Sequence, residues 1–250
     1  MNKTPGRIIR FALVGLFFGT IVLGGVSFLI YFNKQEKAHQ RSVRYASGLR
    51  RELDAAGLGR HEKIILDAFA TPPDKCRRTL ATYLESTFGP ENMGYAVRSV
   101  ADKHDASAPP AAIEIELTGS KRPQDVVLVL CGYLPDLSTI DQAQLSKPLA
   151  AMLGIAHSLT GRELNRSVRF VAVPDSGSLS AYYAEAVSNQ DRITHLVLLG
   201  NLTKAGDAEV LSALHQEGRG AVLKRPEFAG DLVESASRLR DEVLNWADRL

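Results

Sequence analysis

The sequence predicts an α/β domain, a three-layer sandwich with a mixed, centrally parallel sheet, preceded by one transmembrane helix. Between residues 125 and 200, strand-like segments alternate with helical ones, a succession that favours parallel strands joined by right-handed crossovers. The first of these strands, DVVLVLC at 125–131, is an unbroken apolar run of the kind buried on both faces of a parallel sheet. The transmembrane helix is predicted from residues 11–32, which carry no charged side chain.

The apolar segment 11–32 is long enough to cross a bilayer. As a helix that rises about 1.5 Å per residue it would measure about 33 Å, against a hydrocarbon core of about 30 Å. It ends in LIYF with no small-x-small cleavage site after it, so we expect an uncleaved single-pass anchor in the cell membrane. Gly15 and Gly19 form a GxxxG pattern, which leaves a homodimer through this helix as an alternative to a monomeric anchor.

The anchor divides the chain into four predicted parts. Residues 1–10 are a short flank, 11–32 are the anchor, 33–58 are a charged, helix-favouring juxtamembrane stalk, and 59–250 are the α/β domain. The glycines of Gly57-Leu58-Gly59 are expected to end the stalk helix. Basic residues flank the anchor on both sides in nearly equal numbers, so the positive-inside rule by itself does not orient it.

Periodicity and helix breakers predict the first elements of the domain. A helix is expected over 61–70, where Thr71-Pro72-Pro73 ends it, and another over 75–88, capped by Asp74. The alternating segments 93–100 and 112–117 (AIEIEL) predict strands, and strict alternation in the second predicts that one of its faces is exposed.

The second half of the domain continues with a long helix over 142–159, strands over 167–173 and 193–199, and a helix over 178–187 between those strands. A last helix is expected from residue 228 to the C-terminus, with an apolar face that packs back on the sheet and comprises Leu232, Val233, Ala236, Leu239, Val243 and Trp246. Ligands of open α/β sheets bind beyond the carboxyl ends of the strands, so the loops to inspect are 132–141, 174–178 and 200–204.

Composition narrows the function classes. The formal net charge is +2, and outside the juxtamembrane segment basic residues are interspersed with acidic ones, so no nucleic-acid partner is expected. The two cysteines, Cys76 and Cys131, form no CxxC motif and no Cys/His pair, which argues against a zinc finger and a disulfide scaffold. A single bridge between them stays open.

Several segments, in their order and spacing, resemble a known family. They read MGYAV (93–97), IEIELTGSKRPQDVVLVL (113–130), LAAMLGIAHSLTG (149–161), RSVRFVAV (166–173) and ITHLVLLGNL (193–202). Together they resemble the co-catalytic zinc exopeptidases of the aminopeptidase Y and aminopeptidase S type (metallopeptidase clan MH), whose relatives include glutaminyl cyclase. The resemblance covers roughly residues 60–204 and implies a zinc-exopeptidase-like fold, shortened at the C-terminus.

The resemblance also implies a metal site, and this chain lacks its ligands. The family holds two zinc ions with two histidines and three acidic side chains, beside a glutamate general base. The positions that match the family's ligands and base carry Gly132, Ala143, Ser176, Gly177 and Gly200, and residues 203–250 are too short to supply the last histidine region in full. Glycine and alanine have no side-chain atom that binds zinc, so we expect a degenerate member without a cofactor.

Two rebuilt sites are alternatives to this loss. Asp136, Asp141 and Asp175 could hold a hard cation such as calcium or magnesium, although solvated loop acids, with Asp141 as a helix cap, are the simpler interpretation. Ser176 lacks the Gly-x-Ser-x-Gly of a nucleophile elbow. The six histidines contain no HExxH motif and no i,i+4 pair, and His157 and His195 are expected at the edge of the core.

We therefore expect a single-pass membrane protein whose peptidase-like domain is catalytically inactive and binds a peptide or protein partner through the old substrate cleft. The alternative is a diverged membrane-anchored hydrolase or aminopeptidase with a rebuilt site. The candidate cleft residues are Tyr133, Asp136, Asp141, Asp175 and Ser176. Members of the family commonly work outside the cytoplasm, so the resemblance implies an extracytoplasmic domain.

Overall fold

The computed structural model describes residues 43–100, 110–134, 142–174, 191–200, 222–228 and 230–249, with further single positions at 26–28, 31, 34, 179, 182 and 202. The chain divides into two compact units, Met1–Ser42 and Val43–Leu250. No helix among the described residues is long and apolar enough to cross a membrane. The predicted anchor lies outside those residues except at 26–28 and 31, so it stays a prediction.

The second unit holds the α/β elements. Its helices are α2 (Ala55–Phe69), α3 (Pro73–Phe88), α4 (Pro90–Met93), α5 (Gln142–Leu159) and α8 (Leu232–Asp248). Its strands are β1 (Val97–Val100), β2 (Ala112–Leu117), β3 (Arg122–Gly132), β4 (Arg166–Val173), β5 (Arg192–Leu199) and β6 (Val222–Lys224). The sequence predicted α5 and β2 with these bounds and did not predict β6. The helix expected over 178–187 lies outside the described residues except at Leu179 and Tyr182.

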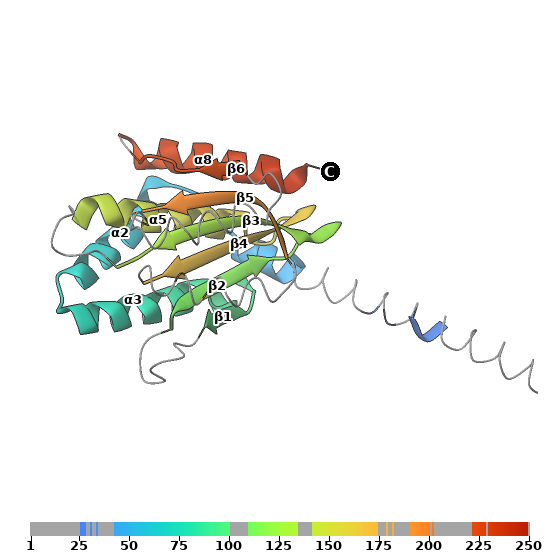
Figure 1. The fold of residues 1–250 in the computed structure, drawn as a ribbon, viewed down its shortest axis with the longest axis horizontal. Helices are drawn as coiled ribbons and strands as arrows, with labels where there is room; N and C mark the ends of the chain where they lie inside the picture. Colours follow the sequence, from blue (N-terminus) through green and yellow to red (C-terminus); the bar gives the residue numbers. More distant parts are fainter. Residues whose placement is uncertain are drawn as a thin grey trace, which may run out of the picture. The chain divides into compact units, whose positions relative to one another are not determined.

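The strands form one mixed sheet in the order β1-β2-β4-β3-β5-β6 (Figure 1). Neighbours run parallel from β4 through β3 and β5 to β6, whereas β1 pairs antiparallel with β2 and β2 pairs antiparallel with β4. Parallel neighbours need a long crossover, and α5 supplies it between β3 and β4. The predicted mixed, centrally parallel sheet is confirmed.

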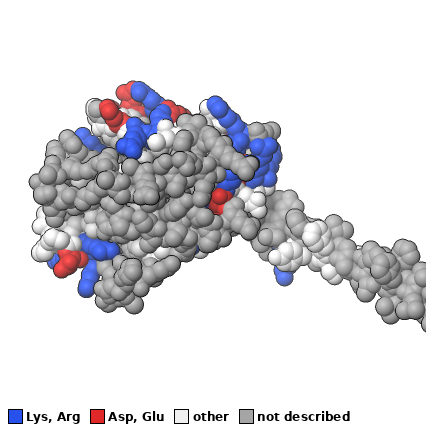
Figure 2. Space-filling model, in the orientation of Figure 1, with Lys and Arg blue, Asp and Glu red and all other residues white. Residues whose placement is uncertain are grey.

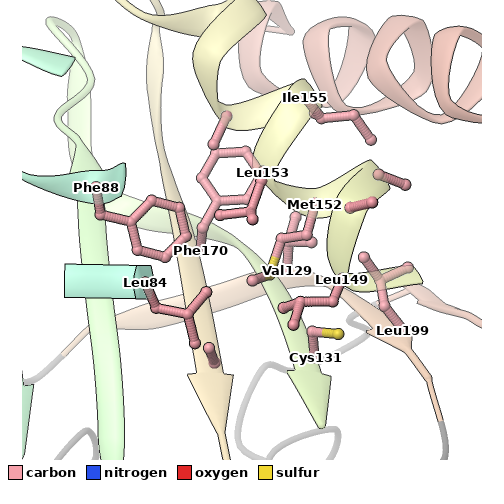
Figure 3. Packing of buried hydrophobic residues seen from close by; sticks show 14 of the residues in the cluster. Leu84, Phe88, Val129, Cys131, Leu149, Met152, Leu153, Ile155, Phe170 and Leu199 are labelled. Atoms are coloured by element: carbon pink, nitrogen blue, oxygen red, sulfur yellow. The ribbon is translucent and has the colours of Figure 1, made fainter. Parts of the chain in front are cut away.

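The larger core lies between the sheet and the helices α2, α3, α5 and α8. The apolar residues that alternate along β3 and β4 on this face pack against α3 and α5 (Figure 3). Each such side chain contributes about 1.5–3 kcal/mol when it is fully buried. The residues labelled in the figure are Leu84, Phe88, Val129, Cys131, Leu149, Met152, Leu153, Ile155, Phe170 and Leu199.

The opposite face of the sheet carries a second, smaller core. Val126, Leu128 and Leu130 of β3 pack there with side chains of β4 and β5. Leu179, Tyr182 and Leu202 also belong to this cluster, so parts of the segments after β4 and β5 contact this face.

Helix α2 differs from the prediction that Gly57-Leu58-Gly59 ends a helix. The residues 43–49 are helical and 50–54 are not, and α2 then begins at Ala55 and continues through both glycines. Asp54 is the N-cap, because its carboxylate accepts a hydrogen bond from the backbone N–H of Gly57 at 2.6 Å. The capping aspartate therefore outweighs the low helix propensity of two glycines.

Helix α3 begins at Pro73, two residues earlier than predicted. Pro72 is at the N-cap position and makes no side-chain capping bond, and Pro73 occupies the first turn, where its missing N–H costs nothing. Asp74 therefore lies inside the first turn and is not the cap. Its negative charge still suits that end of the helix.

The strand β2 is buried more fully than its alternation predicted. Every residue from Ala112 to Leu117 is buried except Glu116, which is half-buried. Glu114 is only 4% exposed because Arg98 of β1 donates two hydrogen bonds to its carboxylate, at 3.1 and 2.9 Å. Both faces of β2 are therefore buried: one carries apolar side chains, and the other carries glutamates that are paired with arginines.

Helix α8 begins at Leu232 rather than at residue 228, because Asp231 caps it, and its apolar face packs into the larger core as predicted. Ala236, Leu239, Val243 and Ala247 lie in the larger core, and Trp246 stacks on His195 of β5 with ring centroids 4.7 Å apart. Its outer surface shows acidic and basic side chains mixed together (Figure 2).

Candidate functional site

The carboxyl ends of β3, β4 and β5 meet at one edge of the sheet. Gly132 pairs in register with Val173 at the ends of β3 and β4, and Cys131 pairs with Leu199 near the ends of β3 and β5. Beyond the strands, the backbone N–H of Tyr133 donates to the carbonyl of Val173 at 2.9 Å, which keeps the first loop residues aligned. The predicted loops therefore do start from neighbouring strand ends.

Two positions that match the family's zinc ligands lie side by side at this edge. The sequence places Gly132 at a histidine position and Gly200 at an aspartate position. A Cβ atom added to Gly200 would stand 3.1 Å from the carbonyl oxygen of Gly132, and Gly200 has a φ of 72°. Because this φ lies in the left-handed region, most side chains would be strained there even if space were available.

Of the other predicted site residues, the structure describes Tyr133 and Ala143. Ala143 is the second residue of α5, and its side chain has no donor atom for a metal. The other positions that the sequence singled out lie outside the described residues, namely Asp136, Asp141, Asp175, Ser176 and Gly177. The rebuilt carboxylate site and the serine site therefore stay untested.

Tyr133, a predicted cleft residue, is buried. Its side chain is 1% exposed and belongs to the larger core with the helix-side residues of β3. A residue so deeply packed does not present its ring to a ligand at the surface. The prediction that Tyr133 lines the cleft is corrected on this point.

The two cysteines are free and buried. The thiol of Cys131 lies within the larger core, 3.5 Å from the carbonyl oxygen of Gly132, to which it donates. Burial raises the pKa of this thiol far above its ordinary value, and burial also raises the pKa of Cys76. Both thiols are therefore protonated at neutral pH, so neither is a reactive nucleophile, and no bridge joins the two.

The strand-end residues that the structure describes do not fit the zinc pair that the fold implies. Gly132, Ala143 and Gly200 offer no side-chain oxygen, nitrogen or thiolate. Among the described residues, no group of three or more histidine, cysteine, aspartate or glutamate side chains is arranged to hold a metal ion.

A buried ion network lies on the other face of the sheet, and the sequence analysis did not anticipate it. Arg169 of β4 donates to Glu116 at 2.5 Å and to Asp191 at 2.6 Å, and its Nε lies 3.5 Å from Glu114. The hydroxyl of Tyr182 donates to Glu114 at 2.7 Å. The network thus ties two neighbouring strands to residues of the segment that joins β4 to β5.

The electrostatics of this network keep Arg169 charged and Tyr182 neutral. Burial by itself lowers the pKa of Arg169, but Tyr182 and the carboxylates of Glu114 and Glu116 outweigh it and raise that pKa. Burial and the negative charge of Glu114 raise the pKa of Tyr182. Neither Arg169 nor Tyr182 therefore exchanges a proton near neutral pH, and both hold the strands together through their hydrogen bonds. The signal was present in the sequence as Arg169 within the otherwise apolar VRFVAV (168–173) and two glutamates within AIEIEL.

No protein-family model matches the sequence, and no curated protein matches it. Solved structures do match. A protein from Bacteroides vulgatus, assigned as a zinc-dependent exopeptidase, shares 11% identity over 80% of this chain and 98% of its own length, with a TM-score of 0.53. The glutaminyl cyclase of Fimbriiglobus ruber shares 13% identity over 80% of this chain and 95% of its own, with a TM-score of 0.49.

The LapB protein of Legionella pneumophila shares 11% identity over 79% of this chain, with a TM-score of 0.48. This chain spans about three fifths of LapB (61%) and of LapA (63%) from the same organism. At these identities the likeness establishes the fold and nothing about activity, and the Bacteroides structure carries that conclusion. The chain has a zinc-exopeptidase-like fold.

Proposed function

We propose that this chain is a membrane-tethered, zinc-exopeptidase-like protein that does not hydrolyse peptides and acts by binding a peptide or protein partner. The observation that carries the proposal is the pair of glycines at neighbouring strand ends, Gly132 and Gly200, where the resemblance implies zinc ligands. Catalytic zinc sites use three protein ligands and activate a bound water. Two adjacent positions without donor atoms remove the basis for that chemistry.

The neighbouring side chains do not compensate for these glycines. The thiol of Cys131 is packed into the core and protonated, so it offers no thiolate to a metal. A ligand at position 200 would also need a left-handed backbone and would crowd the carbonyl of Gly132. The backbone at this edge therefore opposes the return of a ligand by a single substitution.

Binding is supported by the part of the fold that persists. The strands β3, β4 and β5 still end at a common edge, where open α/β sheets bind their ligands. The resemblance to exopeptidases favours an extended peptide or a protein terminus as the occupant. The tether is residues 11–32, and the family's habit of working outside the cytoplasm favours an extracytoplasmic domain.

The catalytic part of the proposal is tested by metal content and activity together. The full-length protein is purified in a non-ionic detergent, incubated with zinc, dialysed exhaustively and measured by mass spectrometry, then assayed with aminoacyl anilide substrates. We expect far less than one zinc per chain and no hydrolysis, whereas an active zinc aminopeptidase taken through the same steps retains both. One or two tightly held zinc ions with hydrolysis would overturn the proposal.

The orientation is tested separately with C-terminal reporter fusions. Alkaline phosphatase is active only outside the cytoplasm, and a green fluorescent protein that folds only inside it reports the opposite. We expect phosphatase activity without fluorescence. Fluorescence alone would place the domain in the cytoplasm and leave the catalytic proposal standing.

A further inference from the structure

We propose that a pocket at the amino-terminal end of helix α2 binds a phosphate group. The pocket has a volume of about 170 Å³ and is lined by the segment 51–61 and by Gly154 and His157 of α5. It is remote from the strand-end edge, because His157 lies 15 residues along α5 from Gln142, or about 22 Å at 1.5 Å per residue. The inference therefore does not depend on the proposed function.

The first argument is an unpaired buried histidine. His157 is 2% exposed, it lines the pocket, and neither of its ring nitrogens has a hydrogen-bond partner in the structure as described. A buried polar group left without a partner costs about 1–3 kcal/mol. Such groups in folded proteins usually have a water, an ion or a ligand as the missing partner.

The second argument is the pairing of His157 with His61 of α2. The two rings are stacked, with centroids 5.9 Å apart and planes inclined by 16°. The Nδ1 atom of His61 shares a hydrogen bond with the hydroxyl of Tyr83 at 2.6 Å. That bond holds the His61 ring in place, and the imidazoles of His61 and His157 both line the pocket.

The third argument is the sign of the local potential. Burial, as the largest cause, and the charge of Arg51 together lower the pKa of both imidazoles to about 4, with a further contribution from Arg60 at His61. Both rings are therefore neutral at pH 7, and each carries one N–H donor. The arginine charges are felt at the rings, so a negatively charged acceptor would be favoured there.

The helix terminus adds to this potential. Ala56 and Gly57, in the first turn of the 15-residue helix α2, line the pocket, and a helix N-terminus carries a partial positive charge that favours anions. Two carboxylates, Glu52 and Asp54, also line it. Asp54 already accepts the N–H of Gly57, so its charge is directed into the cap rather than toward the imidazoles.

The size of the pocket selects the ligand class. About 170 Å³ exceeds the roughly 10–15 Å³ that one water needs and falls below the roughly 300 Å³ of a drug-sized site. A tetrahedral phosphate offers several acceptor oxygens to N–H donors converging from arginine, imidazole and a helix end. The group could be inorganic phosphate or the phosphomonoester headgroup of a lipid, which share this chemistry.

The test is calorimetric titration of the full-length protein, in a maltoside detergent, with inorganic phosphate against chloride at equal ionic strength. We expect saturable binding of one phosphate per chain. Arg60→Gln should weaken binding at least tenfold, while Arg78→Gln, which removes an exposed arginine from α3 outside the pocket, should leave it unchanged. His157→Phe should also weaken it, and if that variant fails to fold, the two arginine variants still decide.

The proposal is overturned if the wild-type protein shows no saturable heat, or if Arg60→Gln and Arg78→Gln bind equally. The source of the phosphate is resolved in lipid nanodiscs. If phosphatidic acid in the discs weakens the binding of inorganic phosphate, and equally charged phosphatidylglycerol discs do not, the ligand is the lipid headgroup. Equal affinity in both identifies free phosphate, and either result supports the site.

Discussion

Replacing Gly200 with alanine is expected to destabilise the domain by about 2 kcal/mol. The φ of 72° lies in the left-handed region, which costs a residue with a side chain about 1–2 kcal/mol. The new Cβ would also stand 3.1 Å from the carbonyl oxygen of Gly132, a backbone atom that cannot swing aside. The contact adds to the conformational cost, so we expect the upper end of that range.

Two matched glycines separate these contributions. Gly230 has a φ of 82° and no atom within 4 Å of an added Cβ, so Gly230→Ala carries the conformational cost alone. Gly59 lies inside helix α2 with free space around it, so Gly59→Ala should stabilise by about 0.5–1 kcal/mol. From the most to the least stable, the predicted order is Gly59→Ala, wild type, Gly230→Ala and Gly200→Ala.

The assay is urea unfolding of the full-length protein, followed by the fluorescence of its single tryptophan. Trp246 stacks on His195 between α8 and β5, so its emission reports the packed domain. With a slope of about 2 kcal/mol per molar urea, a loss of about 2 kcal/mol lowers the midpoint by about 1 M. A Gly200→Ala midpoint equal to wild type, or raised as in Gly59→Ala, would refute the backbone argument at the strand end.

Three further outcomes are expected. His61 and His157 have a folded-state pKa of about 4 against an ordinary 6.5, so between these pH values the unfolded chain binds more protons and the free energy of unfolding should fall as the pH is lowered. His157→Phe should reduce this dependence of stability on pH, and an unchanged dependence would contradict the reasoning. Arg169→Met should cost about 3 kcal/mol in urea unfolding, because it removes the arginine that pairs with the part-buried carboxylates of Glu116 and Asp191. Arg238→Met in an exposed pair should change stability by less than about 1 kcal/mol, and similar losses in the two variants would argue against the network. Cys131 should resist a disulfide reagent in the native state and react on unfolding, and rapid native labelling would contradict its burial.

Local patterning predicted most of the elements in the central part of the fold. The apolar run at 125–131 and the helical period over 142–159 carry their own structural signal, because a short, valine-rich apolar run favours a buried strand and apolar residues three to four positions apart favour a helix. The three-residue strand β6 has no such signal, since a segment that short forms only when β5 pairs with it. The start of helix α2 also depends on one interaction that the pattern does not reveal, the hydrogen bond by which Asp54 caps it.

The candidate site was predictable only in part. The sequence located the strand ends, whereas the loss of the zinc ligands stays a prediction from the family resemblance. The burial of Tyr133 could not be predicted from the sequence, since it depends on how the chain leaves β3 and enters the larger core. The stacking of His61 on His157 joins residues 96 positions apart, and no pattern in either helix marks it.

The sequence by itself determined the class of the fold and its strand–helix succession, since these follow from the identity and spacing of neighbouring residues. The tertiary structure decided the left-handed backbone of Gly200, the burial of Glu114 beside Arg98 and Arg169, and the pocket beside His157. Each of these depends on contacts between segments distant along the chain, where the free energy is set by which groups lose water together rather than by any local preference.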